Sequence, residues 1–124
     1  MSLQGKITNA LLSAMKHLED SKKFITENDE NKLSNHVWRA SAELEYALFL
    51  FSVLRQNEHQ SHPWKLELES KQLEVPPVIA STQELLQKAK VGFESGDLLE
   101  AHKNTWIARG YLMKVQEVLE KKRK

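Results

Sequence analysis

The feature that most restricts the fold of this chain is the spacing of its apolar residues. In four stretches they recur at every third or fourth position, which is the periodicity of a helix that buries one face. Only four glycines and three prolines occur among the 124 residues, a composition that favours long helices. The spacing predicts helices over about residues 3–26, 30–57, 77–95 and 98–122, and hence an all-α fold.

Each expected helix carries a seam of apolar or small residues, as the helices of a bundle do. The second helix has further apolar residues beside its seam, Phe49, Leu50 and Val53, so we expect it to be the most buried of the four. The seams are Ile7, Leu11, Ala14, Leu18 and Ile25; Leu33, Val37, Ala40, Leu44, Ala47, Phe51 and Leu54; Val78, Thr82, Leu85, Leu86, Ala89 and Phe93; and Leu98, Ala101, Thr105, Ala108, Leu112, Val115 and Leu119.

Two short breaks have the residues of helix ends. Asn28 can adopt the left-handed conformation that closes a helix, and Asp29 can cap the helix that follows. Gly96 and Asp97 form the same pair between the third and fourth helices. The third helix has a second possible start, because residues 81–84 match a capping box that would delay it to Thr82.

The two halves of the chain match when they are shifted by 68 positions. Trp38 then falls on Trp106, and Asp29 falls on Asp97. We interpret the chain as a single domain, residues 1–124, forming a four-helix up-down bundle of two αα-hairpins (about 3–57 and 77–122) that are either a duplication or two unrelated hairpins. The connection, residues 58–76, is expected to be extended and to cover one end of the bundle, or to contain a short helix from Pro63.

Composition excludes several classes of function. The absence of cysteine removes disulfides, thiolate nucleophiles and cysteine-bound zinc. The net charge is only +1, and the one cationic cluster is the tail Lys121, Lys122, Arg123 and Lys124, which favours a helix-dipole role over nucleic-acid binding. No run of about 18 apolar residues is present and no basic stretch followed by an apolar run opens the chain, so we expect a cytoplasmic protein without a membrane partner or a cofactor.

One histidine pair has the spacing of metal ligands. His59 and His62 form an H-x-x-H motif beside Glu58, and two histidines with a carboxylate can hold zinc. In a polar connection, two histidines at this spacing are more often exposed residues that bind no metal. The motif is therefore a weak alternative to a protein that binds no metal.

Arg55 and His62 are separated by six residues, and the segment 38–48 before them is rich in alanine and glutamate. This arrangement is similar to the R-x4-6-H motif of HEPN domains, small helical bundles of which many are ribonucleases and others bind nucleotides. The resemblance implies an RNA-processing or nucleotide-binding domain that uses Arg55 and His62. The resemblance implies that Arg55 stabilises a phosphate and His62 acts as acid or base. Gln56 stands where that motif usually has asparagine, and the motif lies at the end of the second helix. More generally the chain resembles small uncharacterised helical-bundle proteins of prokaryotes.

Tryptophan and arginine flank the seams of the second and fourth helices. Trp38 and Trp106 each lie one residue beyond a seam position, and helical spacing places His102 and Arg109 on the same strip as Trp106. Such residues are enriched at protein–protein contacts, although a boundary tryptophan also serves the core. The leading prediction is a non-enzymatic interaction module, homodimeric or bound to another protein. Gly110 predicts the close approach of a neighbouring helix.

Overall fold

The computed structural model describes residues 2–55, 64–66 and 73–122. These residues form four helices and no strand: α1 (Leu3–Thr26), α2 (Glu30–Leu54), α3 (Val75–Glu94) and α4 (Leu98–Lys122). The all-α bundle of two hairpins, α1 with α2 and α3 with α4, is therefore confirmed. Within the described ranges, no helix has both the length and the apolar character needed to cross a membrane.

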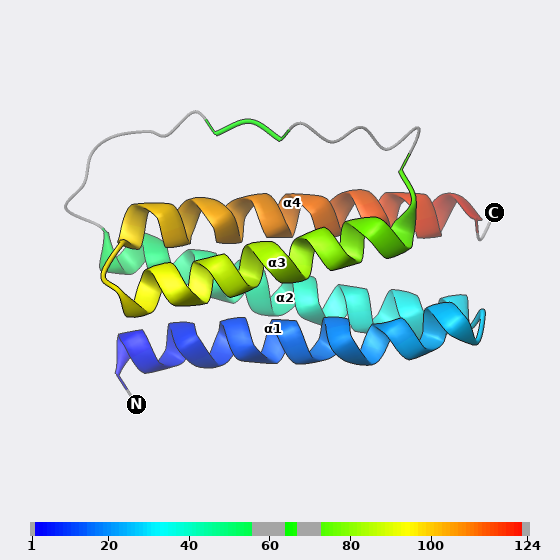
Figure 1. Ribbon diagram of the computed structural model, residues 1–124, viewed down its shortest axis with the longest axis horizontal. Helices are drawn as coiled ribbons and strands as arrows, with labels where there is room; N and C mark the ends of the chain where they lie inside the picture. Colours follow the sequence, from blue (N-terminus) through cyan, green and yellow to red (C-terminus); the bar gives the residue numbers. More distant parts are fainter. Residues whose placement is uncertain (1, 56–63, 67–72, 123–124) are drawn as a thin grey trace.

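The two hairpins stack so that every helix has two neighbours. α2 packs against α1 and α4, and α3 packs against α4 and α1, which leaves α1 diagonal to α4 and α2 diagonal to α3. In Figure 1, α1 and α4 run from left to right while α2 and α3 run from right to left. All packed neighbours are thus antiparallel, and the two hairpin turns lie at opposite ends of the bundle.

Most of the predicted seam residues form the interior. The exceptions are the half-buried seam residues Ile25, Leu54, Leu85, Phe93 and Leu98, and the buried Ala10, Val75 and Ile79, which no predicted seam included. Leu11, Leu44, Leu86 and Leu112 have no exposed surface, and the hydroxyls of the buried Thr82 and Thr105 donate to carbonyls of their own helices. As expected, α2 has the largest number of buried residues of the four helices, eight, but only one of its three extra apolar residues is among them. Leu50 is buried, but Phe49 is 62% exposed and Val53 is 37% exposed.

The two hairpin turns have the same backbone structure. Asn28 and Gly96 adopt the left-handed conformation, with φ of 55° and 88°, as predicted. After each of them an aspartate N–H donates to a carbonyl five residues back, over 2.9 Å in the first turn and 2.8 Å in the second. These bonds satisfy carbonyls that the end of a helix leaves unpaired.

The aspartates that follow cap the next helices as expected. Asp29 accepts a hydrogen bond from the backbone N–H of Lys32 over 3.1 Å, and Asp97 accepts one from Glu100 over 3.2 Å. Both donors are three residues beyond the aspartate, where a helix has N–H groups without an internal partner. The shift of 68 positions therefore relates the turns bond by bond.

The start of α3 differs from the prediction by two residues. The helix begins at Val75 and accommodates Pro76 and Pro77 in its first turn, where a helix needs no backbone donor. Thr82 lies in the helix interior and is buried. The alternative start at Thr82, based on the capping box, is wrong.

Of the connection, the structure describes residues 64–66 and 73–76. Residues 64–66 and 73–74 are neither helix nor strand, and residues 75–76 already belong to α3. A helix that started at Pro63 would include residues 64–66. These residues are not helical, so this alternative is wrong for them. Trp64 contacts His102 and Trp106, and Leu66 lies over Gly110, so the segment packs on α4. The expectation that its apolar residues cover one end of the bundle is wrong for this segment, which runs beside α4 (Figure 1).

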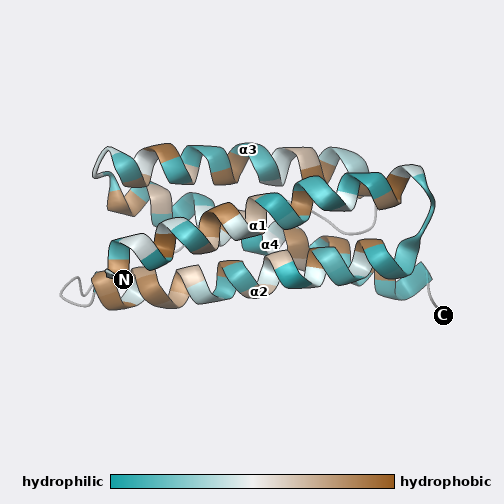
Figure 2. Ribbon diagram, turned by 90° about the horizontal axis from the view of Figure 1, so that it is seen from below, coloured by the Kyte–Doolittle hydropathy of each residue, from teal (hydrophilic) through white to brown (hydrophobic). Residues whose placement is uncertain are grey.

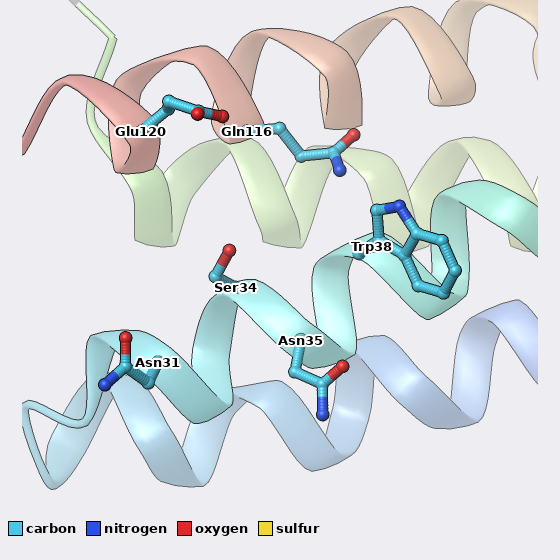
Figure 3. A pocket seen from close by; sticks show the side chains of 6 residues that line it. All are labelled: Asn31, Ser34, Asn35, Trp38, Gln116 and Glu120. Carbon is cyan, nitrogen blue, oxygen red and sulfur yellow. The ribbon is translucent and has the colours of Figure 1, made fainter. Parts of the chain in front are cut away.

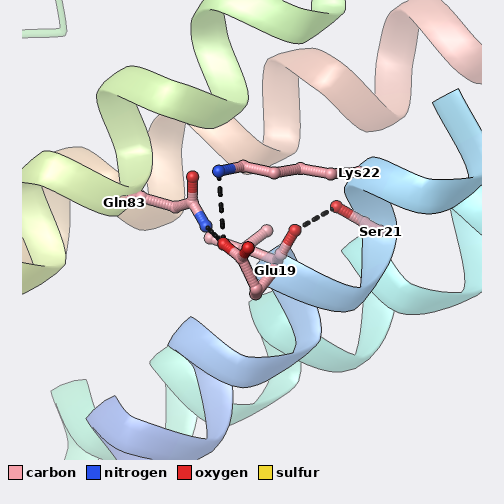
Figure 4. A network of polar contacts seen from close by, with 5 residues as sticks. Glu19, Ser21, Lys22 and Gln83 are labelled. Carbon is pink, nitrogen blue, oxygen red and sulfur yellow. Dashed lines mark hydrogen bonds and ion pairs between the residues drawn. The ribbon is translucent and has the colours of Figure 1, made fainter. Parts of the chain in front are cut away.

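A polar contact ties α1 to α3 at the surface (Figure 4). The side chain of Gln83 donates to the Glu19 carboxylate over 3.0 Å, and Lys22 lies 3.2 Å from the same oxygen. These two hydrogen-bonding partners hold the pKa of the Glu19 carboxyl below its ordinary value. The contact is exposed, so it adds orientation to an interface that apolar packing already forms.

Replacing Asp29 or Asp97 by alanine should each lower the free energy of unfolding by about 1 kcal/mol, because each side chain caps a helix. Urea unfolding measures the effect. Ser81→Ala is the control: Ser81 is exposed within α3, so its replacement should be neutral or slightly stabilising. A loss at Ser81 equal to those at the aspartates would contradict the observed start of α3.

Candidate functional site

α2 is apolar on two sides, and only one of them faces the core. The second side is a stripe of exposed apolar side chains that begins at Trp38, 60% exposed, and includes Phe49, 62% exposed. Eleven residues separate them, about three helical turns, so they lie almost in line. We call Trp38, Ala42, Tyr46, Phe49 and Val53 the α2 stripe; all five are exposed. In Figure 2 the C-terminal end of α2, at the left, is brown, the colour of hydrophobic residues.

Sequence reasoning recognised Trp38 but not the rest of this stripe. The signal was present for two of its residues, because Phe49 and Val53 were recognised as apolar residues beside a seam that was already complete. The residues of a complete seam already fill the contacts with the neighbouring helices. Apolar residues outside that seam are therefore left exposed. Exposed aromatic residues in one line are a recognised property of protein–protein contact surfaces.

A groove about 440 Å³ in volume lies beside Trp38, between α2 and α4 (Figure 3). Five of its lining side chains are polar, and one of these, Glu120, is acidic. Hydrogen-bonding groups next to an exposed indole can fix the orientation of a bound group, which an apolar surface alone cannot do. The lining residues are Asn31, Ser34, Asn35, Trp38, Gln116 and Glu120.

Arg109 joins α4 to α2 halfway along their interface. Its guanidinium Nη2 lies 3.2 Å from Oε1 of Glu45, and its Nε donates to the same oxygen over 3.4 Å. Arg109 is therefore engaged within the bundle. The contact lies between the part of α4 that faces Trp38 and the part that faces Phe51, and because it is partly exposed it adds orientation to helices that apolar packing already holds.

Trp106 and His102 lie in a covered environment, unlike Trp38. The ring of His102 stacks on Phe51 at 5.2 Å, and Trp64 contacts both His102 at 5.1 Å and Trp106 at 5.9 Å. Trp106 is half-buried as a result. The structure thus separates the predicted interaction residues: Trp38 faces solvent, Arg109 pairs with Glu45, and the other two lie under the connection.

Leu66 explains the glycine in the middle of α4. A Cβ added to Gly110 would lie 2.9 Å from both terminal carbons of Leu66. The close approach predicted at Gly110 is real, but the approaching residue belongs to the connection and not to a neighbouring helix. Sequence reasoning missed Trp64 and Leu66 as the partners of Trp106 and Gly110.

Arg55 lies at the end of α2 and is turned into the protein. It is 7% exposed, and its Nη1 donates to Nδ1 of His102 over 2.8 Å. Because arginine only donates, Nδ1 of His102 must be the acceptor. His62, its predicted catalytic partner, lies outside the described residues, so the Arg55–His62 pair remains a prediction.

The candidate metal ligands His59 and His62 also lie outside the described residues. Among the residues that are described, no three histidine, aspartate or glutamate side chains form a group that could hold a metal ion. Of the basic tail, Lys121 and Lys122 form the last turn of α4, where cations complement the helix dipole. Arg123 and Lys124 fall beyond the described part of the chain.

Two histidines meet between α1 and α2 near the first turn. The rings of His17 and His36 are 5.7 Å apart, and Phe24 stacks on His36 at 5.2 Å. Burial, followed by the charges of His36 and Arg39, lowers the pKa of His17; the acidic Glu43 and Asp20 oppose this shift. The folded protein therefore binds a proton at His17 less readily than the unfolded chain does.

The fold and this surface define a class: a small all-α bundle with an unpartnered aromatic stripe on one helix. Comparisons with protein-family models, curated proteins and solved structures give no match to this chain. The resemblances to HEPN domains and to small prokaryotic bundle proteins therefore remain predictions, and the function has to be argued from the geometry.

Gly110→Ala should stabilise α4 by about 1 kcal/mol only when Leu66 is also alanine. With Leu66 present the new methyl meets its terminal carbons at 2.9 Å, so the gain should be cancelled or reversed. Urea unfolding of both single variants and the double variant gives the coupling energy. Gly92→Ala is the control, since its Cβ would have no contact closer than 3.7 Å; equal effects of Gly110→Ala in both backgrounds would disprove the contact.

Acidification should destabilise the fold through His17. Its pKa is lowered in the folded protein, so the unfolded chain binds the proton more readily and stability falls as the pH drops through about 6.5. The thermal midpoint, measured from about pH 8 to pH 5, should decline less steeply for His17→Gln than for the wild type. Parallel curves for the two proteins would show that His17 is not responsible.

Proposed function

We propose that this chain is a non-enzymatic protein–protein interaction module that binds its partner, a second copy or another protein, through the α2 stripe. The observation that carries the proposal is the alignment of two largely exposed aromatic side chains, Trp38 and Phe49, on one helix. Burying an aromatic side chain of this size contributes about 1.5–3 kcal/mol. Because both side chains are largely exposed in the isolated chain, most of this free energy becomes available only when a partner covers them.

The surroundings of the stripe support an interface. Polar side chains line the groove beside Trp38, and the Glu45–Arg109 ion pair lies between Trp38 and Phe49 along the helix. An apolar centre with polar groups at its edge is the usual composition of contact surfaces between proteins. We place this module in the cytoplasm, and no bound cofactor or nucleic acid forms part of the proposal.

The interaction proposal is favoured over the HEPN-like alternative by the environment of Arg55. A phosphate-binding arginine has to reach its substrate, whereas this guanidinium is nearly buried and donates to His102. Binding a phosphate there would require Arg55 to leave that contact, at a cost in stability.

The double variant Trp38→Ser, Phe49→Ser should abolish assembly while leaving the fold intact, because exposed positions contribute little to folding stability. Sedimentation velocity measures the mass of the purified chain and of the tagged chain in extract of the native cells. We expect a species heavier than the monomer for the wild type and a loss of that species in the double variant.

Val91→Ser is the matched control. Val91 is 53% exposed but lies on α3, away from the stripe, so this variant should assemble like the wild type. A wild-type chain that stays monomeric in both settings, or a double variant that assembles normally, would refute the proposal.

A further inference from the structure

The two halves of the bundle each carry an outward-lying tryptophan at the same position, one on α2 and one on α4. The shift of 68 positions that superimposes the turns also brings Ser34 onto His102, Trp38 onto Trp106 and Ala42 onto Gly110. α2 and α4, which carry these triplets, pack antiparallel to each other. We call His102, Trp106 and Gly110 the α4 seat, and Ser34, Trp38 and Ala42 the α2 seat.

The α4 seat is filled by the chain itself. Trp64 lies against His102 and Trp106, and two residues later Leu66 lies on Gly110. Residues 64–66 are neither helix nor strand, and Lys65 between the two contacts is exposed. The occupant of this seat is therefore a short irregular segment with the order aromatic, basic, aliphatic.

The α2 seat is open at the corresponding place. The groove beside Trp38 contains Ser34 and is completed by Gln116 and Glu120 of α4 (Figure 3). Trp38 is 60% exposed, whereas its counterpart Trp106 is half-buried under Trp64. The two tryptophans thus differ in that Trp64 lies on Trp106, whereas Trp38 remains largely exposed.

We propose that the α2 seat binds an extended segment of a partner protein whose sequence places a tryptophan or tyrosine, a basic residue and an aliphatic residue in succession. This inference rests on the proposed function and specifies the chemistry of the partner. The aromatic ring covers Trp38 as Trp64 covers Trp106. The aliphatic side chain lies beside Ala42, farther from the helix backbone than Leu66 lies from Gly110, because Ala42 carries a Cβ where Gly110 has none.

Charge and hydrogen bonding define the occupant further. Among the described residues that line the groove, Glu120 is the only charged one, so a basic side chain is favoured and an acidic one is disfavoured. The amide and hydroxyl groups of Asn31, Ser34 and Gln116 can accept a hydrogen bond from an indole N–H or a phenol O–H. Phenylalanine has no such donor and would bind less tightly.

A second copy of the chain is the less favourable occupant. Each copy has two seats and one segment of residues 64–66, so moving that segment to the α2 seat of a neighbour uncovers its own α4 seat. The exchange removes the two ring contacts of Trp64, with His102 and Trp106, and can create only one, with Trp38, because Ser34 has no ring. Contacts that fill the α2 seat without emptying another have to come from a different protein.

The test uses the complete chain labelled with 15N and a synthetic peptide, acetyl-Ser-Pro-Trp-Lys-Leu-Ser-amide. Each tryptophan gives one indole N–H signal, and Trp38→Phe assigns that of Trp38. We expect the peptide to shift the signals of Trp38, Ser34 and Gln116 with a Kd on the order of 1 mM, and those of Trp64 and Trp106 to stay in place because an attached segment outcompetes a free one.

Two changes test the chemistry of the occupant. Replacing the tryptophan of the peptide by alanine should weaken binding about tenfold or more. Exchanging its lysine for glutamate should weaken binding to the wild type, and Glu120→Lys in the protein should restore it, with both effects reduced by salt. Val91→Ser, on α3, should bind the original peptide like the wild type.

The outcomes separate this inference from the proposed function. No shift at Trp38 up to about 5 mM peptide, equal shifts with the alanine peptide, or shifts confined to Trp64 and Trp106 would overturn the α2 seat. If the sedimentation experiment nevertheless succeeds, the interaction module stands and its partner has another chemistry. If the peptide binds as expected while sedimentation fails, the seat stands and the proposed assembly is wrong.

Discussion

Burial of apolar seams between antiparallel neighbours is the constraint on which the rest of this structure depends. Each helix packs against two others, so leucines such as Leu44 and Leu112 reach the centre and lose all contact with water. Side chains of this kind fill the interior to the density of a crystal. The core therefore contributes to stability. Among the described residues, the exposed aromatic and polar side chains that could bind a partner lie on the surface where α2 and α4 meet.

Local rules were sufficient to predict most of the architecture. The seams follow from helical periodicity, and the two turns follow from Asn28 with Asp29 and from Gly96 with Asp97, because backbone conformation and capping are decided by a few adjacent residues. The start of α3 was misplaced because two adjacent prolines were interpreted as the end of a connection. In the first turn of a helix their missing N–H groups cost nothing.

The candidate site was only partly predictable, since it depends on contacts between residues distant in sequence. Trp38 and Trp106 have equivalent positions by pattern, yet one is exposed and the other is covered by Trp64. Hydropathy identifies apolar residues without identifying what covers them. For the same reason Phe49 was expected to be buried: the sequence does not distinguish an apolar residue on the solvent-facing side of a helix from one that faces the core.

The diagonal relation of α2 and α3 has a consequence for how the protein holds together. The seams involve α1 to α4 only, while residues 55–74 link two ends that lie a helix length apart, about 30 Å for a helix of 20 residues. Besides the packing of Trp64 and Leu66 on α4, the link is thus a tether that fixes the local concentration of one hairpin around the other. Severing it would turn an intramolecular fold into a bimolecular one, whose population depends on dilution, and would make the two halves suitable as complementing fragments.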